Sequence, residues 1–448
     1  MSPLRPLLLC MILGFAVLAS VALIREPKRP ITYNPENDQW KSAANERIDR
    51  YRKSDIILDI EFDSNKYEYL EVKIEQLRHS FSFGTAIDAY DYTAIPEYAQ
   101  KIHRYFNEVV LENDLKWQQW SNKQPTSKYR QSRTLEAIRN LKDSGINVRG
   151  HCLLWAPILD YERIDQAISP NVYQNDKRFI QAQLSHVQDL LHKTKGYINE
   201  WDAINHLVSK DHKNTLLLEE KYGLGIYREV FALRKYFGLS YYVNESKVLT
   251  SRGEKYLPYL ERVTKMKAED LSPDGIGFMS HFEPDNLPDM DTLYGRLDTF
   301  ASLGVDLKIT EFDIMFGKRG IKSYPNENDL QLQAQFTEDF LRMCFSHPKM
   351  RGIMLWGFWE QNHWYPDAAL WSSEWEIKPN GKAWLDLVHK EWWTQEEHQL
   401  TKSNNISTRG FKGDYSIKIY DRPGNLLHEL YFSLGDTSYL SKIKIPAS

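Results

Sequence analysis

Side chains that can do chemistry recur at the ends of short apolar segments in this chain of 448 residues. The carboxylates, amides, imidazoles and indoles at these ends, with one ammonium, are Glu112, Asn113, Lys116, His151, Trp155, Asn205, His206, His281, Glu311 and Trp356. Carboxylates and imidazoles transfer protons, and flat indole rings offer large apolar faces. If the segment ends meet at one place, they form a polar site with stacking surfaces, which suits a sugar.

The sharpest candidate is Glu311. Leu307, Ile309 and Glu311 alternate along one apolar segment and therefore share one face of an extended strand. If Leu307 and Ile309 fill the interior of a barrel, Glu311 continues inward at its mouth. A carboxylate held there is a candidate nucleophile for glycosyl transfer, since retaining glycosidases pair such a group with an acid about 5–5.5 Å away.

The elements that would position these residues are β-like segments alternating with helical stretches. The segments are 81–87, 108–113, 147–155, 197–205, 240–245, 275–281, 306–313 and 352–359. Amphipathic helices are predicted between them, for example at 133–144 and 329–346. Alternation of this kind indicates parallel βαβ units, and no strand is followed by a glycine-rich phosphate loop. The pattern predicts an α/β fold, a (β/α)8 TIM barrel over residues 81–395, in which chemistry collects where strands end.

The two ends of the chain are predicted to pair into one small accessory β domain. The N-terminal segment, 26–80, opens with a linker at 26–35 and continues with β-like runs at 55–62 and 68–76. The C-terminal segment, 396–448, holds three further runs, at 415–420, 426–434 and 439–445. Neither set has enough strands to be stable alone, and a closed barrel brings its first and last units together.

The composition excludes several classes of protein. The net charge is −4, from 57 Lys and Arg against 61 Asp and Glu, so no basic excess favours a nucleic-acid partner. Hydrophobic residues make up 42% and charged residues 26%, which is the balance of a globular protein rather than a disordered one. Three cysteines are too few for a disulfide scaffold.

Residues 1–25 are predicted to be a signal peptide or a signal anchor. The apolar run from Leu7 to Ile24 follows Arg5 and precedes further basic residues. Either form places the rest of the chain outside the cytoplasm, secreted or anchored to a membrane through residues 7–24. Asn244 and Asn405 also match the N-glycosylation sequon.

Over residues 47–394 the chain resembles glycoside hydrolase family 10, the endo-β-1,4-xylanase family. Several motifs stand in the family's order: FSFGTAI opens the barrel, VVLENDLKW resembles E-N-x-x-K-W, VRGHCLLW resembles R-G-H-x-L-x-W, WDAIN resembles the start of W-D-x-x-N-E, PDGIGFMSHF resembles D-G-I-G-x-Q-S-H, ITEFD holds T-E-x-D, and LWGFWEQNHW resembles W-G-x-x-D-x-x-S-W.

The resemblance implies a role for each candidate. Glu311 would attack the anomeric carbon, Asn205 would bind the sugar 2-hydroxyl, and His281 would orient Glu311. The candidates that would line the −1 and −2 subsites or wall the cleft are Glu112, Asn113, Lys116, His151, Trp155, Trp356 and Trp364. The implied partner is xylan or a related β-1,4-linked polysaccharide, and neither a metal nor another cofactor is implied.

The chain departs from the family's pattern at the acid/base position, where His206 replaces the glutamate that follows the asparagine of W-D-x-x-N-E. Glu200 cannot substitute for it, because six residues of extended strand span roughly 20 Å at about 3.3 Å each. Met279 also stands where the family commonly has glutamine, and Glu360 and His363 replace an aspartate and a serine.

Three interpretations of His206 remain open. In the first, His206 itself serves as acid and base, since an ordinary imidazole has a pKa of about 6.5. Alternatively, the site binds xylan-like chains without useful turnover. In the third, His206 holds a metal together with Glu311 and His281. The sequence therefore predicts a weak or altered retaining xylanase-like hydrolase, with a catalytically inactive carbohydrate-binding protein as the alternative.

Overall fold

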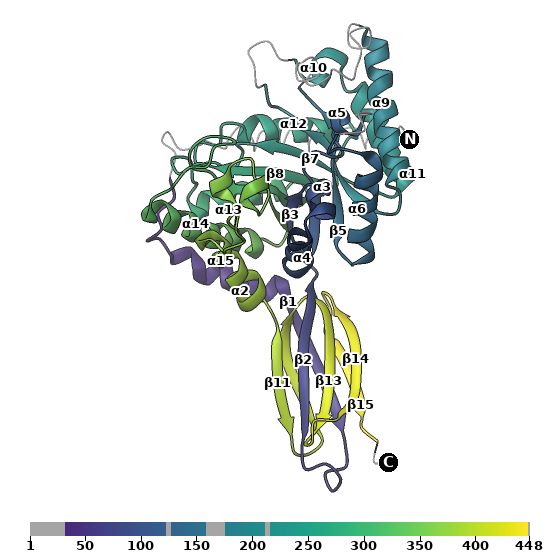
Figure 1. The fold of residues 1–448 in the computed structure, drawn as a ribbon, viewed down its shortest axis with the longest axis vertical. Helices are drawn as coiled ribbons and strands as arrows, with labels where there is room; N and C mark the ends of the chain where they lie inside the picture. The colour runs from purple at the N-terminus through teal and green to yellow at the C-terminus, as the bar shows by residue number, and fades with distance from the viewer. Residues whose placement is uncertain (1–31, 122–126, 158–174, 211–215, 447–448) are drawn as a thin grey trace, which may run out of the picture.

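The computed structural model describes residues 32–121, 127–157, 175–210 and 216–446, which form a barrel and a β-sandwich (Figure 1). The expected signal peptide or anchor at 1–25 lies outside these residues, so a secreted or anchored protein stays a prediction. Within the described ranges, no helix combines the length and the apolar character needed to cross a membrane.

Eight parallel strands close into the predicted (β/α)8 barrel, in which β10 is hydrogen-bonded to β3. The strands are β3 (Ser82–Ile87), β4 (Glu108–Leu111), β5 (Asn147–Trp155), β6 (Ile198–Asn205), β7 (Ser240–Ser246), β8 (Gly275–Phe282), β9 (Asp306–Ile314) and β10 (Met350–Leu355). Most of their residues are buried on both faces, so their sequences are rich in apolar residues, which is why the sequence pattern locates all eight.

Helices surround the barrel. They are α3 (Ala89–Ala94), α4 (Pro96–Tyr105), α5 (Trp117–Trp120), α6 (Gln131–Asp143), α9 (Asp176–Lys193), α10 (Leu218–Tyr222), α11 (Gly225–Phe237), α12 (Tyr256–Ala268), α13 (Met290–Ala301), α14 (Glu327–Ser346) and α15 (Pro379–Asp386). The helices predicted at 133–144 and 329–346 are confirmed as α6 and α14. Helix α6 buries Ala137, Ile138 and Leu141 on one face, and Asn326 caps α14 by accepting a hydrogen bond from the Asp329 N–H.

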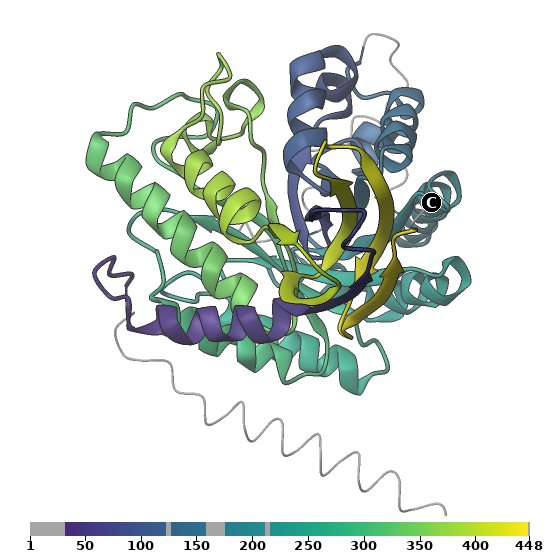
Figure 2. The same cartoon turned by 90° about the horizontal axis from the view of Figure 1, so that it is seen from below.

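The terminal segments form the expected accessory domain, a sandwich that projects from one end of the barrel (Figures 1 and 2). One sheet has the order β12-β1-β15, and the other has the order β11-β2-β13-β14. The strands are β1 (Lys53–Glu61), β2 (Leu70–His79), β11 (Gln395–Leu400), β12 (Asn404–Phe411), β13 (Gly413–Asp421), β14 (Leu426–Leu434) and β15 (Tyr439–Lys444). Ile56 and Leu58 of one sheet pack with Ile74 and Ile417 of the other in a core of their own.

The terminal segments also hold elements that the sequence pattern does not predict. The C-terminal segment has five strands instead of three, because β11 and β12 are polar strands with few buried residues. The N-terminal segment also contains helix α2 (Gln39–Arg52), which lies between the linker expected at 26–35 and the first expected strand at 55–62. This helix buries Trp40, Ala44 and Ile48 along one narrow stripe and packs on α14.

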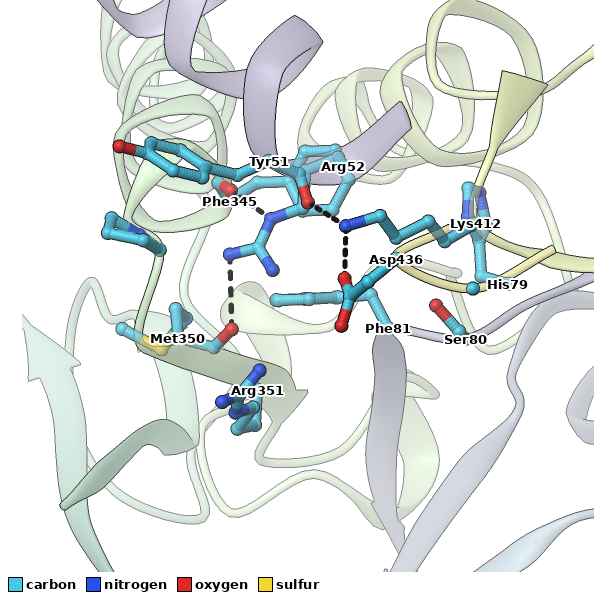
Figure 3. Close-up of a pocket in the computed structure, with 12 residues that line it drawn as sticks. Tyr51, Arg52, His79, Ser80, Phe81, Phe345, Met350, Arg351, Lys412 and Asp436 are labelled. Atoms are coloured by element: carbon cyan, nitrogen blue, oxygen red, sulfur yellow. Dashed lines mark hydrogen bonds and ion pairs between the residues drawn. The ribbon is translucent and has the colours of Figure 1, made fainter. Parts of the chain in front are cut away.

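A pocket of about 470 Å³ lies where the sandwich joins the barrel (Figure 3). Arg52 donates to the carbonyl oxygens of Phe345 at 2.7 Å and Met350 at 3.1 Å, and Lys412 donates to that of Tyr51 at 2.8 Å. Arg52 ties the end of α2 to the end of α14 and the start of β10, and Lys412 ties the sandwich to the end of α2. The sandwich is thus fixed to the amino-terminal end of the barrel strands, opposite the end that carries the candidate residues.

Candidate active site

The candidate residues gather toward the carboxyl ends of the barrel strands, the end that carries chemistry in this architecture. His151 and Trp155 lie in β5, Asn205 ends β6, His281 lies in β8, and Glu311 lies in β9. The loops that leave the barrel at this end carry the others, Glu112, Asn113, Lys116, His206, Trp356 and Trp364.

Glu311 is buried at the barrel mouth between two side chains. His281 Nε2 lies 2.9 Å from Glu311 Oε2, and the amide of Asn244 donates to Oε1 at 3.3 Å. The other ring nitrogen of His281 lies 2.8 Å from Asp313 Oδ1. Burial alone would lower the pKa of His281, but the carboxylates of Asp313 and Glu311 outweigh it and raise the pKa to about 10. His281 is therefore an imidazolium at neutral pH and presents a fixed cation to Glu311.

Asn244 belongs to this site as well. Its side chain is fully buried, and its Oδ1 accepts a hydrogen bond from Thr310 Oγ1 at 2.7 Å while its amide donates to Glu311. A side chain buried in this way cannot carry a glycan in the folded protein. The sequon at Asn244 is therefore part of the site, whereas Asn405 is exposed on β12.

A buried network of ion pairs orients His151. Its Nδ1 lies 2.8 Å from Asp202 Oδ2, and Arg149 donates to both oxygens of Asp202. Burial alone would raise the pKa of Asp202, but Arg149 and His151 lower it to about 2. An ionised Asp202 accepts the Nδ1 proton, which makes Nε2 the edge of His151 that can meet a ligand.

Lys116 lies between two indoles. Its ammonium is 5.5 Å from the ring centre of Trp155 and 6.0 Å from that of Trp356, and it donates to Asn113 Oδ1 at 3.0 Å. The ring of His151 packs edge-on against Trp356 with ring centres 5.3 Å apart. Side chains from β5 and from the loops that follow β4 and β10 therefore form one continuous surface of charge and aromatic rings.

Trp364 and Glu112 complete the set. The Trp364 indole donates to Asp313 Oδ2 at 2.6 Å, and its ring lies edge-on to His281 at 4.6 Å. Glu112 follows β4 directly, and burial raises the pKa of its carboxyl. The eleven predicted residues therefore lie at one end of the barrel.

The chain leaves β6 through a left-handed turn at His206, where φ is 57°. The imidazole packs edge-on against Trp155 at 4.5 Å, and its Nδ1 lies 3.3 Å from Ser209 Oγ. Asn205, directly before it, is buried, and within the described residues its Oδ1 has no hydrogen-bond partner. A buried carbonyl oxygen of this kind is suited to accept a hydrogen bond from a sugar hydroxyl.

Glu200 lies near the opposite end of the barrel, as the strand spacing predicts. It accepts hydrogen bonds at 2.6 Å from both Arg149 and Lys308, and Lys308 also bonds Glu108, the first residue of β4. Glu200 therefore cannot act as an acid at the mouth of the barrel. In the part of the chain that the structure describes, no three His, Cys, Asp or Glu side chains are grouped as ligands for a metal ion.

The substitutions after β10 support the loop that carries Trp364. Glu360 forms ion pairs with Lys322 at 2.9 Å and with Lys378 at 3.1 Å. Burial alone would raise the pKa of Glu360, but these cations and its hydrogen bonds lower it to about 2. His363 is buried, and burial lowers its pKa to about 4. Glu360 therefore anchors the loop through its ion pairs, and His363 Nδ1 accepts a hydrogen bond from the Tyr365 N–H at 3.1 Å.

Comparison with known proteins identifies the family. The model of glycosyl hydrolase family 10 matches residues 74–387. The chain belongs to glycosyl hydrolase family 10. This confirms the resemblance seen in the motifs. The matched residues include the whole barrel and most of β2, the strand that precedes it.

Among curated proteins, this family 10 chain is 28% identical over 416 residues to anti-sigma-I factor RsgI6 of Acetivibrio thermocellus, covering 91% of this chain and 50% of that protein. It is 26% identical over 414 residues to endo-1,4-β-xylanase 3 of Arabidopsis thaliana, covering 89% and 50%. The chain thus spans about half the length of these relatives. Among solved structures, xylanase 10B from Thermotoga petrophila RKU-1, solved in complex with xylobiose, superposes on this chain with a TM-score of 0.58 at 20% sequence identity. The match includes 70% of this chain and 95% of the xylanase chain, which shows a shared fold.

Several residues that hold this family 10 site lie outside the predicted set. Asp313 falls two residues after Glu311 on the same strand face, and Asp202 lies upstream of His206 on β6, so strand parity could have found both. Glu245 stands at the end of a predicted strand, but nothing in the sequence shows which side chains surround it.

Proposed function

We propose that this family 10 chain is a retaining glycoside hydrolase that cleaves β-1,4-linked xylan, with Glu311 as its nucleophile. The observation that carries the proposal is the hydrogen-bonded series of Asp313, His281 and Glu311. A carboxylate held beside a fixed imidazolium has one orientation and a positive neighbour, which suits attack on an anomeric carbon. Relatives named endo-1,4-β-xylanase and a structural neighbour solved with xylobiose support this substrate class.

The remaining candidates bind the polysaccharide in this proposal. Trp155 and Trp356 offer aromatic faces, while Lys116 and His151 Nε2 offer donors to hydroxyl groups. Asn205 Oδ1 accepts a hydrogen bond from the sugar 2-hydroxyl. Export through residues 7–24 fits such a substrate, because a polymer of this kind is met outside the cell.

We infer that His206 serves as both acid and base. In the first step, Glu311 displaces the leaving sugar at the anomeric carbon while the His206 imidazolium gives its proton to the glycosidic oxygen. In the second step, the neutral imidazole takes a proton from the water that releases the sugar from Glu311. Turnover is expected to be slow, because nearby carboxylates favour the imidazolium and Met279 offers no polar partner.

Carbohydrate binding without turnover is the second candidate function. The observation that favours it is the replacement of the family's acid/base glutamate by His206, since loss of a general acid or base costs about 10²–10⁴ in rate. The binding surface built from the indoles, Lys116 and His151 would be the same in both cases.

The two functions are separated by offering the protein xylan and an aryl β-xyloside. Cleavage of both substrates supports the hydrolase with His206 as the acid. Cleavage of the aryl substrate alone means that Glu311 acts without an acid, because a good leaving group needs no proton. Binding of xylo-oligosaccharides with no cleavage of either substrate supports the second candidate.

A further inference from the structure

A buried polar cluster lies behind His206 and contains no residue of the predicted site. We call Ser209, Glu245 and Lys255 the Glu245 cluster. Ser209 follows β6, Glu245 lies near the end of β7, and Lys255 precedes α12. Ser209 and Glu245 are fully buried, so neither can touch a polysaccharide in the cleft.

Glu245 is a buried carboxylate with several donors. The backbone N–H groups of Val208 and Ser246 donate to it at 2.7 and 2.8 Å, and Lys255 Nζ donates at 3.1 Å. The Ser209 hydroxyl donates to the same carboxylate. Burial alone would raise the pKa of Glu245, but the charges of Lys255 and His206 and these hydrogen bonds lower it. Glu245 is therefore ionised and only accepts hydrogen bonds.

The direction of these bonds determines which ring nitrogen of His206 carries a proton. A hydroxyl has one proton to donate, and that of Ser209 is given to Glu245. Lys255 also donates to Ser209 Oγ, so that oxygen already acts as an acceptor. At 3.3 Å from the same oxygen, His206 Nδ1 therefore meets an acceptor and must be the donor. The proton that titrates is then the one on Nε2.

We propose that Glu245 acts through Ser209 as a positioning residue, which holds His206 as the tautomer protonated on Nδ1 and makes Nε2 the atom that exchanges a proton at the acid/base position. The catalytic part of this inference rests on the proposed function, whereas the tautomer does not. The Trp155 ring packs edge-on against the imidazole and restricts its rotation, so the nitrogen on the far edge from Ser209 keeps one direction.

The charges around His206 oppose one another. Glu245 Oε1 lies 4.0 Å from His206 Nδ1 and favours the imidazolium, while Lys255 pairs with the same carboxylate and opposes it. A further cation, the ammonium of Lys116, lies 5.5 Å from the ring centre of Trp155, the indole that packs against His206. Removing either member of the Glu245–Lys255 pair should therefore shift the pKa of His206 in opposite directions.

The tautomer is tested on the whole protein labelled with ¹⁵N-histidine, whose ring nitrogens report protonation by NMR. A His206→Gln spectrum identifies the His206 signals among those of the 13 histidines. At a pH where His206 is neutral, we expect Nδ1 to carry the proton, and Ser209→Ala to shift the ring toward the Nε2–H form. A neutral His206 protonated on Nε2 in the unchanged protein would overturn the proposal.

The pair of charges is tested by titrating the same signals. Glu245→Gln should lower the pKa of His206 by about one unit, at the low end of the effect of a charge within about 4–6 Å. Lys255→Met should raise it by a similar amount, which a merely structural loss would not do. If the two variants shift the pKa of His206 in the same direction, or leave it unchanged, the inference is contradicted. If Glu245→Gln does not fold, the result for Lys255→Met decides alone.

These results are independent of turnover. If the unchanged protein hydrolyses xylan, the alkaline limit of kcat/KM should move with the pKa of His206 in both variants. A kinetic limit that stays fixed while the NMR pKa moves would remove His206 from the acid/base role. A tautomer held as predicted in a protein that binds but does not cleave would refute the proposed function and leave the structural inference standing.

Discussion

Replacing His206 with glutamine separates the work of the acid/base from that of the nucleophile. The variant keeps a polar group near Ser209 but has no proton to exchange, and the contacts of Glu311 with His281 and Asn244 are untouched. Loss of the acid should slow cleavage of xylan by about 10²–10⁴, which corresponds to about 2.7–5.4 kcal/mol at 1.36 kcal/mol for each tenfold. An aryl xylobioside with a dinitrophenyl leaving group needs no proton, so its first step should proceed at an almost unchanged rate.

The assay follows the release of dinitrophenol over time. We expect a rapid burst equal to the enzyme concentration and then a slow steady rate, because no base activates water in the second step. Added azide should restore the steady rate, since this anion attacks without losing a proton. The matched control is His398→Gln, which changes a histidine of the sandwich far from the site and should alter neither substrate. Equal losses on both substrates, or no loss on xylan, would refute the reasoning.

Three further changes test other contacts of the site. Glu311→Gln keeps the shape of the nucleophile and removes its charge, so cleavage of the aryl xylobioside should fall to background, and normal cleavage would show that the site is misplaced. Trp155→Ala should weaken binding of xylo-oligosaccharides by about 1–3 kcal/mol in calorimetry, and an unchanged titration curve would return Trp155 to a packing role. The pKa of His281 is raised from 6.5 to about 10 in the folded protein, so its ion pairs stabilise the fold fully below pH 6.5 and less as the pH rises toward 10. In urea unfolding between pH 6 and 10, His281→Gln should flatten this decline, and an unchanged slope would contradict the assignment.

The barrel could be predicted because its strands are buried on both faces. Segment 352–359 is mostly apolar, segment 306–313 alternates Leu307 and Ile309 with polar residues, and helices such as α14 repeat apolar residues at helical spacing. The strands β11 and β12 could not be predicted from apolar residues, because many of their side chains are exposed and polar. They are held in the sandwich by backbone hydrogen bonds to β2 and β1. Helix α2 is not predicted from the sequence, because its buried face holds only a few apolar residues among many charged ones.

The site could be predicted as far as strand parity and family motifs extend. Glu311 follows from both, His281 follows from its place at a strand end and from the motif, and Glu200 is excluded by strand length alone. The surroundings of His206 could not be predicted, because Ser209, Glu245 and Lys255 come from three separate parts of the chain and meet beside His206 only in the fold. A pattern in the sequence names the residue at the acid/base position, but only the fold shows what it faces.

The most direct test of the central claim, that Glu311 is a glycosyl-transfer nucleophile, is to trap the covalent intermediate. A dinitrophenyl 2-deoxy-2-fluoro-β-xylobioside needs no acid to react, and its fluorine slows release, so the test does not depend on His206. Mass spectrometry of the digested protein is predicted to find one fluoroxylobiosyl group on the peptide that contains Glu311, and none in Glu311→Gln. A label on another residue, or an unlabelled protein that nevertheless binds xylobiose, would contradict the account.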